Sequence, residues 1–292
     1  MTKSFKVAGH IFSLTMPETC SLWGHLSQYE PFALPSPEPG LFTVELADDL
    51  PEGERECVYD APTEPGETVI RLYRQGEDWL FEMLPDSRRP VCARMLADPG
   101  FSNGKLQLLS RRVTDALFGV NNGLMLLYAF TTATLGTLEM HASVVSNGGK
   151  GYLFLGKSGT GKSTHSRQWL QYIEGSELMN DDNPIVRVLE DGRVMVYGSP
   201  WSGKTPCYRN VEAPVGAFVQ IRQCPENRIT RMGALEAYAT LYSSCSGFKA
   251  DSEMADGLHS TMEKTVFTVP CYVLDCRPDE EAARVCAGEV RK

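Results

Sequence analysis

Residues 151–173 of the 292-residue chain read GYLFLGKSGTGKSTHSRQWLQYI. Within this stretch, residues 156–163 match the phosphate-binding pattern G-x-x-x-x-G-K-S without a mismatch. The apolar run 152–155 predicts a buried strand before the loop, and the spacing of Trp169, Leu170 and Ile173 predicts a helix after it. A strand, a glycine-rich loop and a helix in this order are the context that the pattern requires. The stretch therefore predicts a site for a nucleotide or another polyphosphate.

The residues of this loop have separable tasks. Its glycines allow backbone conformations in which successive N–H groups point at a polyphosphate, and the following helix adds the positive end of its dipole. We expect Lys162 to contact the β- and γ-phosphates and the Ser163 hydroxyl to complete the coordination of a Mg²⁺ held by them. The expected nucleotide contacts come from Gly156, Lys157, Ser158, Gly159, Thr160, Gly161, Lys162, Ser163 and Thr164.

The composition limits the classes of function. Hydrophobic residues make up 42% and charged residues 22% of the chain, which is ordinary for a globular protein. A net charge of −9 argues against a broad nucleic-acid surface. The most apolar segment, 124–135, is short and contains three threonines, which predicts a buried helix and no membrane span. Nine cysteines without a C-x-x-C pair, and an N-terminus without the features of a signal peptide, favour reduced thiols, no zinc site and a cytoplasmic protein.

The first hundred residues have a mostly β pattern. Apolar residues partly alternate over 6–14 and 41–46, as in half-buried strands, and the runs 68–73 and 79–84 flank a glycine-containing turn that predicts a hairpin. The sequence pattern changes near residues 101–104, and a long helix is expected over 114–134. We therefore expect a β-rich N-terminal region of unknown role over 1–105 and a nucleotide-binding, kinase-like domain over 106–292.

A histidine is expected at the mouth of the phosphate loop. The β-prone runs 138–146 and 150–155 flank Asn147-Gly148-Gly149, which predicts a hairpin. If Gly148-Gly149 forms the two-residue turn, His141 lies opposite Gly156; if Asn147-Gly148 forms it, His141 lies opposite Phe154. In either register His141 is a candidate metal ligand or phosphate partner.

Two carboxylates follow the next predicted strand, 177–179. Asp181 and Asp182 are expected at its C-terminal end, where open α/β sheets bind their ligands. One aspartate would hold the Mg²⁺, directly or through water, and the other would take the proton from an acceptor hydroxyl; the sequence leaves open which does which. The expected catalytic residues are Asp181, Asp182, Lys162 and His141. The candidate ligands of the metal, Mg²⁺ or Mn²⁺, are Ser163, Asp182 and His141.

The rest of the chain offers weaker signals. In the loop GSPWSGKT at 198–205 and shortly after it, Lys204 and Arg209 are candidates for binding an anionic group of the second substrate. We expect strands over 215–222 and 229–232 that pair across 225–227, helices over 234–243 and 252–263, a strand over 269–274 and a final helix over 278–290.

His141, the GKSGTGKS loop and the following Asn-Asp-Asp together resemble the P-loop kinase core shared by HPr kinase/phosphorylase and phosphoenolpyruvate carboxykinase. The resemblance covers roughly residues 135–200, and MHAS at 140–143 and SGTGKST at 158–164 are similar to carboxykinase segments. It implies an α/β fold, of the mixed α+β type with antiparallel strands entering the sheet, a metal-linked role for His141, and the role of metal ligand or catalytic base for Asp181 or Asp182. We find no counterpart of the carboxykinase lysine pair or of the glutamate-arginine-glycine signature of HPr kinases, so the chain looks like a member of the wider HPr-kinase-related group.

Three functions remain as hypotheses. The first is an ATP-dependent kinase that moves the γ-phosphate to a hydroxyl of a small molecule or of a protein serine. The second is a nucleotide-responsive binding module without turnover, whose β-rich N-terminal region recognises a partner. The third is a carboxykinase-type lyase, against which the missing lysine pair counts. The acceptor, the choice between ATP and GTP or pyrophosphate, and whether the chain forms a homo-oligomer are not identified by the sequence, which favours neither a nucleic acid nor a membrane as partner.

Overall fold

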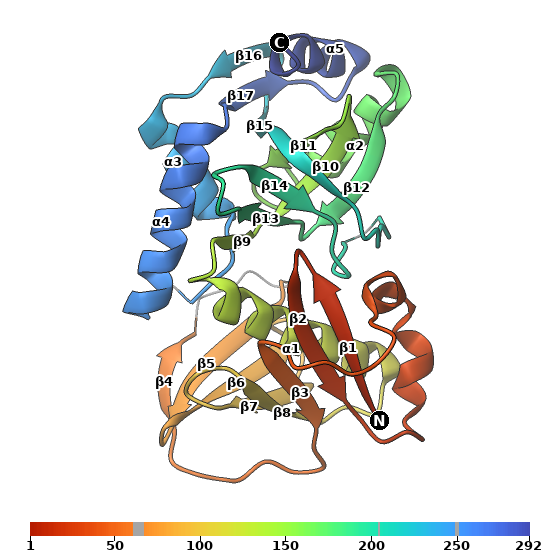
Figure 1. Ribbon diagram of the computed structural model, residues 1–292, viewed down its shortest axis with the longest axis vertical. Helices are drawn as coiled ribbons and strands as arrows, with labels where there is room; N and C mark the ends of the chain where they lie inside the picture. The colour runs from red at the N-terminus through yellow and green to blue at the C-terminus, as the bar shows by residue number, and fades with distance from the viewer. Residues whose placement is uncertain (61–66, 204, 249–250) are drawn as a thin grey trace. The chain divides into compact units, whose positions relative to one another are not determined.

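The computed structural model describes residues 1–60, 67–203, 205–248 and 251–292. The chain forms two compact units, Met1–Thr131 and Thr132–Lys292 (Figure 1). Each unit combines helices with a sheet that contains both parallel and antiparallel strand pairs. The fold is therefore of the mixed α/β class, as the sequence predicted.

The first unit contains an eight-stranded sheet with the strand order β1-β2-β3-β8-β7-β6-β5-β4. The predicted hairpin is confirmed, because β5 and β6 pair across a turn at Gly76 and Glu77. The segment 6–14, however, contains a turn at Ala8 and Gly9 and contributes to two strands. The strands are β1 (Thr2–Val7), β2 (His10–Thr15), β3 (Phe42–Leu46), β4 (Glu56–Tyr59), β5 (Val69–Gln75), β6 (Asp78–Leu84), β7 (Ala93–Ala97) and β8 (Asn103–Leu108), and two 3-10 helices lie at Ser21–His25 and Ser27–Phe32.

Helix α1 (Val113–Thr132) belongs almost entirely to the first unit, so the units divide later than the boundary expected near residue 105. The helix lies so close to the sheet that a Cβ on Gly119 would be 2.6 Å from the Cβ of Ala93. The Tyr128 hydroxyl also donates to the carbonyl of Val7 at 3.1 Å. The expected boundary falls within β8, and α1 supplies a buried face to the N-terminal sheet. Among the helices of the described residues, none has the length and hydropathy needed to cross a membrane.

The second unit is built on a nine-stranded sheet. Its main path runs β12-β10-β11-β15-β14-β13-β9, and β17 pairs with both β15 and β16. The pairs β11/β15 and β15/β17 are parallel, whereas β10 is antiparallel to both of its neighbours. The strands are β9 (Thr137–Glu139), β10 (Ala142–Asn147), β11 (Lys150–Leu155), β12 (Glu177–Asp182), β13 (Ile185–Val188), β14 (Val194–Tyr197), β15 (Glu212–Gln223), β16 (Arg228–Arg231) and β17 (Cys271–Cys276).

Two apolar cores lie on either side of this sheet. One core joins β11 and β15 to α2 (Lys162–Tyr172) and α5 (Glu280–Val290), and the other joins the sheet to α3 (Ala234–Ser244) and α4 (Ser252–Thr268) (Figure 1). The expected pairing of 215–222 with 229–232 is wrong. Strand β17 lies between them, because the chain returns through α4 to pair in parallel with β15, and β16 then pairs with the outer edge of β17.

Candidate phosphate-binding site

The hairpin β10–β11 sets the position of His141. Its register pairs Asn147 with Lys150 and Ala142 with Leu155, so Gly148-Gly149 forms the turn, with φ values of 58° and 76°. This is the first of the two registers allowed by the sequence. Continued by one residue, it places His141 opposite Gly156, the first residue of the phosphate loop. Local turn chemistry thus brings the histidine to the loop.

The phosphate loop has the backbone that its glycines permit. Gly156, Gly159 and Gly161 have φ values of 144°, 79° and 108°, in the region that side chains disfavour. A Cβ at Gly156 would also lie 2.6 Å from the Thr160 hydroxyl oxygen. Gly161 is the N-cap of α2 and offers no side-chain cap, so the first turn of the helix presents its backbone N–H groups to a ligand.

Lys162 connects the loop to His141. Its ammonium donates to the Gly156 carbonyl at 2.8 Å and to the Lys157 carbonyl at 3.3 Å, and lies 2.8 Å from His141 Nε2. Burial lowers the pKa of Lys162, while the negative charges of Asp182 and Asp181 act in the opposite direction. Both carboxylates are therefore electrostatic neighbours of the loop lysine.

The tautomer of His141 follows from its partners. An ammonium group can only donate, so Nε2 accepts from Lys162 and the ring proton resides on Nδ1. Nδ1 lies 3.1 Å from Asp182 Oδ1, within ion-pair distance. Lys162, His141 and Asp182 thus form a continuous series of polar contacts from the phosphate loop to a carboxylate, which we call the lysine–histidine–aspartate chain.

The two aspartates occupy the end of β12, as expected. This strand pairs with β10, with Asp181 opposite Ser143 and Asp182 opposite Ala142. Asp181 is buried, whereas 35% of the Asp182 side chain is exposed. Asp182 also has a φ of 141°, which is unusual for a residue with a side chain. Such backbone outliers persist where surrounding contacts hold them, often at functional sites.

Those contacts come from the loop after β14. Asn180, buried between the two segments, donates to Ser199 Oγ at 3.1 Å and to the Trp201 carbonyl at 3.1 Å. The Gly203 N–H donates to the Asp181 carbonyl at 2.7 Å, and a Cβ on Gly203 would lie 3.0 Å from Asp182 Cγ. Asn180 was not a candidate from sequence because Asn in a polar run equally indicates a turn. In the structure, Asn180 holds the loop after β14 against the end of β12.

Glu139 is a second residue that the sequence did not identify. It ends β9, two residues before His141, and is buried. Burial raises the pKa of Glu139 to about 8, and the negative charge of Asp182 adds to this effect. The sequence does contain a signal for this residue, because Glu139 is a single carboxylate inside the apolar run that leads to His141. Glu139 thus places a mostly protonated acid close enough to Asp182 to feel its charge near neutral pH.

The two cations proposed for the second substrate have different outcomes. Arg209 donates to the Leu178 carbonyl at 2.7 Å and to Glu177 Oε2 at 2.8 Å. Both partners lie at the start of β12, at the opposite end from the aspartates. The guanidinium therefore holds the strand, and the structure does not bring it to the site. Lys204 lies outside the described residues.

The donor set fits a hard cation that arrives with phosphates. Within the residues that the structure describes, no group of three or more His, Cys, Asp or Glu side chains is arranged to hold a metal ion. The two ring nitrogens of His141 face Lys162 and Asp182, at 2.8 Å and 3.1 Å, and its role as a metal ligand stays a prediction. Mg²⁺ bound to a nucleotide needs only one or two protein oxygens. Ser163, in the first turn of α2, and an aspartate carboxylate offer oxygens of this kind.

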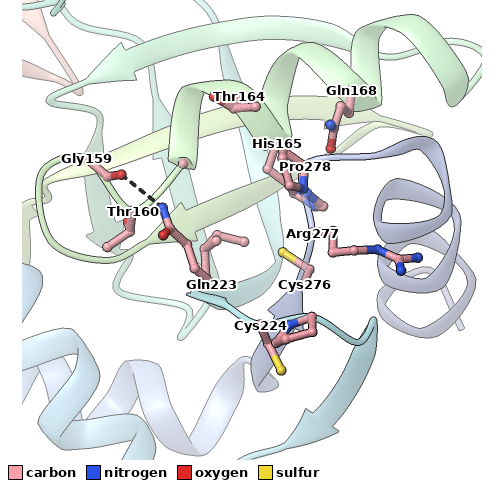
Figure 2. Close-up of a pocket in the computed structure, with 13 residues that line it drawn as sticks. Gly159, Thr160, Thr164, His165, Gln168, Gln223, Cys224, Cys276, Arg277 and Pro278 are labelled. Carbon is pink, nitrogen blue, oxygen red and sulfur yellow. Dashed lines mark hydrogen bonds between the residues drawn. The ribbon is translucent and has the colours of Figure 1, made fainter.

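A cavity of about 630 Å³ adjoins the phosphate loop (Figure 2). It extends from the loop along α2 to the ends of β15 and β17. At its edge Gln223 donates to the Gly159 carbonyl at 3.3 Å, which ties the loop to β15. The lining residues are Gly159, Thr160, Gly161, Thr164, His165, Gln168, Ile221, Gln223, Cys224, Pro225, Cys276, Arg277 and Pro278.

Comparisons with known proteins do not place the chain in a family. No protein-family model matches it, and a search of curated proteins finds no significant match.

Proposed function

We propose that the chain is an ATP-dependent P-loop phosphotransferase of the HPr-kinase-related group, with a core like that of phosphoenolpyruvate carboxykinase. It would move the γ-phosphate of ATP to a hydroxyl of a small molecule or a protein. The observation that carries this proposal is the lysine–histidine–aspartate chain. It joins the residue expected at the β- and γ-phosphates to one of two carboxylates suited to handle metal and proton.

The residues divide the work of phosphoryl transfer. The loop N–H groups and Lys162 neutralise charge on the phosphates, which is the main catalytic requirement of this reaction. Of Asp181 and Asp182, one takes the proton of the acceptor hydroxyl and the other contributes an oxygen ligand beside Ser163. A bound Mg²⁺ would supply further neutralisation of the phosphate oxygens. His141 lies between Asp182 and Lys162, 3.1 Å from the Asp182 carboxylate and 2.8 Å from the Lys162 ammonium, and would hold that carboxylate close to the phosphate loop.

The buried surroundings support a catalytic role for this arrangement. Lys162 is 8% exposed, and the loop 199–203 holds the backbone of Asp181 by hydrogen bonds and packs against the side chain of Asp182. Charges held in a partly desolvated place act more strongly on a reacting phosphate than charges in water. A site that only sensed nucleotide would require the phosphate loop but not two carboxylates held against it.

The proposal is tested by following the label from γ-labelled ATP and Mg²⁺ after the protein is added to an extract of its host. Small molecules and proteins are separated, and Lys162→Ala serves as the inactive control. Lysine-dependent label in either fraction is the expected result and identifies the class of acceptor. Label that stays in ATP, with normal ATP affinity, would instead favour the nucleotide-responsive binding module.

A further inference from the structure

Two residues that line the cavity beside the phosphate loop, His165 and Gln168, each carry a buried polar atom that has no hydrogen-bond partner among the described residues. His165 is 2% exposed and Gln168 is 9% exposed. Neither His165 Nδ1 nor Gln168 Oε1 has a hydrogen-bond partner in the part of the chain that the structure describes. Both residues lie on the face of α2 that borders the cavity, one turn apart (Figure 2). Buried polar atoms are normally paired, so this pair indicates a ligand.

The hydrogen-bonding role of His165 is fixed by its neighbour. The Trp169 indole N–H donates to His165 Nε2 at 3.1 Å, and an indole can only donate. The proton of the neutral ring therefore resides on Nδ1. Burial lowers the pKa of His165 to about 4, which keeps the ring neutral at pH 7. The cavity thus offers one donor, His165 Nδ1–H, beside one acceptor, Gln168 Oε1.

The remaining walls suit a flat, uncharged ring system. Ile221, Pro225 and Pro278 contribute apolar side chains to the lining of the cavity. Arg277 also lines the cavity, but its guanidinium is paired with Asp279 at 2.8 Å and with Glu281 at 2.9 Å. No strong net charge therefore faces the centre of the cavity from this side.

We propose that this cavity binds the purine base of the nucleotide, with His165 and Gln168 reading one edge of the ring by a donor and an acceptor. The inference rests on the proposed function, because it takes the phosphates to lie in the loop. The cavity begins at Gly159, Gly161 and Thr164 and runs along α2, so phosphates in the loop direct the nucleoside into it. Adenine presents a ring nitrogen beside an amino group, and guanine presents a carbonyl beside a ring N–H; each matches the pair. Pyrimidines present similar edges, so the preference for a purine comes from the larger apolar ring area that a two-ring base buries against the cavity walls.

Isothermal titration calorimetry with ADP, GDP, UDP and pyrophosphate separates base contacts from phosphate contacts. We expect ADP or GDP to bind the wild-type protein more tightly than pyrophosphate and UDP. Gln168→Leu should weaken the binding of that purine nucleotide on the order of tenfold, which is the effect of one buried hydrogen bond, and leave the affinity for pyrophosphate unchanged. Gln171→Leu, the same substitution at an exposed position of α2, is the matched control and should change neither affinity.

Several outcomes would overturn the inference. Equal affinities for pyrophosphate and for all three nucleotides would show that the cavity does not hold the base, and UDP binding as tightly as the purine nucleotides would remove the purine preference. A Gln168→Leu protein with unaltered purine affinity, or with equal losses for pyrophosphate and nucleotide, would remove the edge contact. Thermal unfolding of each variant identifies a folding defect. If Gln168→Leu has one, the wild-type protein is titrated instead with purine riboside diphosphate, a nucleotide that lacks the amino group. Failure of every probe to bind would instead refute the proposed function itself.

Discussion

His141→Phe tests whether the lysine–histidine–aspartate chain contributes to transfer. The substitution keeps a ring of similar size but removes the hydrogen-bond acceptor for Lys162 and the polar contact with Asp182. A hydrogen bond to a charged group contributes about 1.5–3 kcal/mol when buried. The His141 and Asp182 side chains are 41% and 35% exposed, so solvent screening reduces the contribution of each polar contact to about 1 kcal/mol. A combined loss of about 2 kcal/mol corresponds to roughly a 30-fold fall in the rate of transfer.

The expected effect is confined to transfer. Lys162 retains its two carbonyl partners in the loop, so the affinity for nucleotide should change little. The assay measures initial rates of label transfer from γ-labelled ATP and, separately, ATP affinity by calorimetry. His25→Phe, at an exposed position of the first unit, controls for a general effect of the substitution. Transfer within threefold of the wild type would refute the role given to His141, and a parallel loss of ATP affinity would show that the ring supports the loop instead.

Three further predictions concern charged residues. Asp181→Asn and Asp182→Asn should each reduce transfer by at least about 100-fold with ATP affinity retained, and a Mg²⁺ titration should restore activity only in the variant that lost the metal ligand; equal, Mg²⁺-independent rates in both would contradict the division of roles. Asp115→Asn should lower the free energy of unfolding by about 2 kcal/mol at pH 7. Burial alone would raise the pKa of Asp115, but the hydrogen bonds from Ser110 and Arg89 lower it below its ordinary value. The ionised Asp115 therefore stabilises the fold above the unfolded pKa of about 4, and this stabilisation is lost as the pH falls through the folded pKa. Denaturation at pH 7 and pH 3 would show this, and an equal difference at both values would contradict it. Arg209→Gln should lower stability without changing the KM for the acceptor; a raised KM would return Arg209 to the site.

The part of the site that the sequence predicted is the part built by local rules. The phosphate loop requires glycines at fixed positions, and the two-residue turn Gly148-Gly149 sets a register that carries His141 to Gly156. Both predictions concern residues that are close in the sequence. Both depend on backbone conformations that the positions of the glycines reveal. The strand that ends in Asp181 and Asp182 was also placed correctly, because it follows directly after α2.

The parts that the sequence did not predict depend on contacts between distant segments. Strand β17 lies between β15 and β16 in the sheet, although α3 and α4 separate it from both in the sequence, and no local pattern predicts that insertion. The contacts of Asn180 with Ser199 and Trp201 cross from one strand to a later loop. Helix α1 joined the first unit for a similar reason, since its apolar pattern predicts burial but not the sheet against which it is buried.

The use of both aspartates in one site depends on a departure from regular strand geometry. Successive side chains of a strand point to opposite faces, so a regular β12 would direct Asp181 and Asp182 to different faces of the sheet. Asp181 pairs with Ser143, whose hydroxyl bonds to Ser166 of α2, and therefore belongs to the face that carries the phosphate loop. At Asp182 the backbone turns to a φ of 141°, and its carboxylate reaches His141 on that same face. Gly203 packs directly against this carboxylate, and a side chain there would push it away, so the loop that follows β14 holds the second aspartate in the conformation that the site requires.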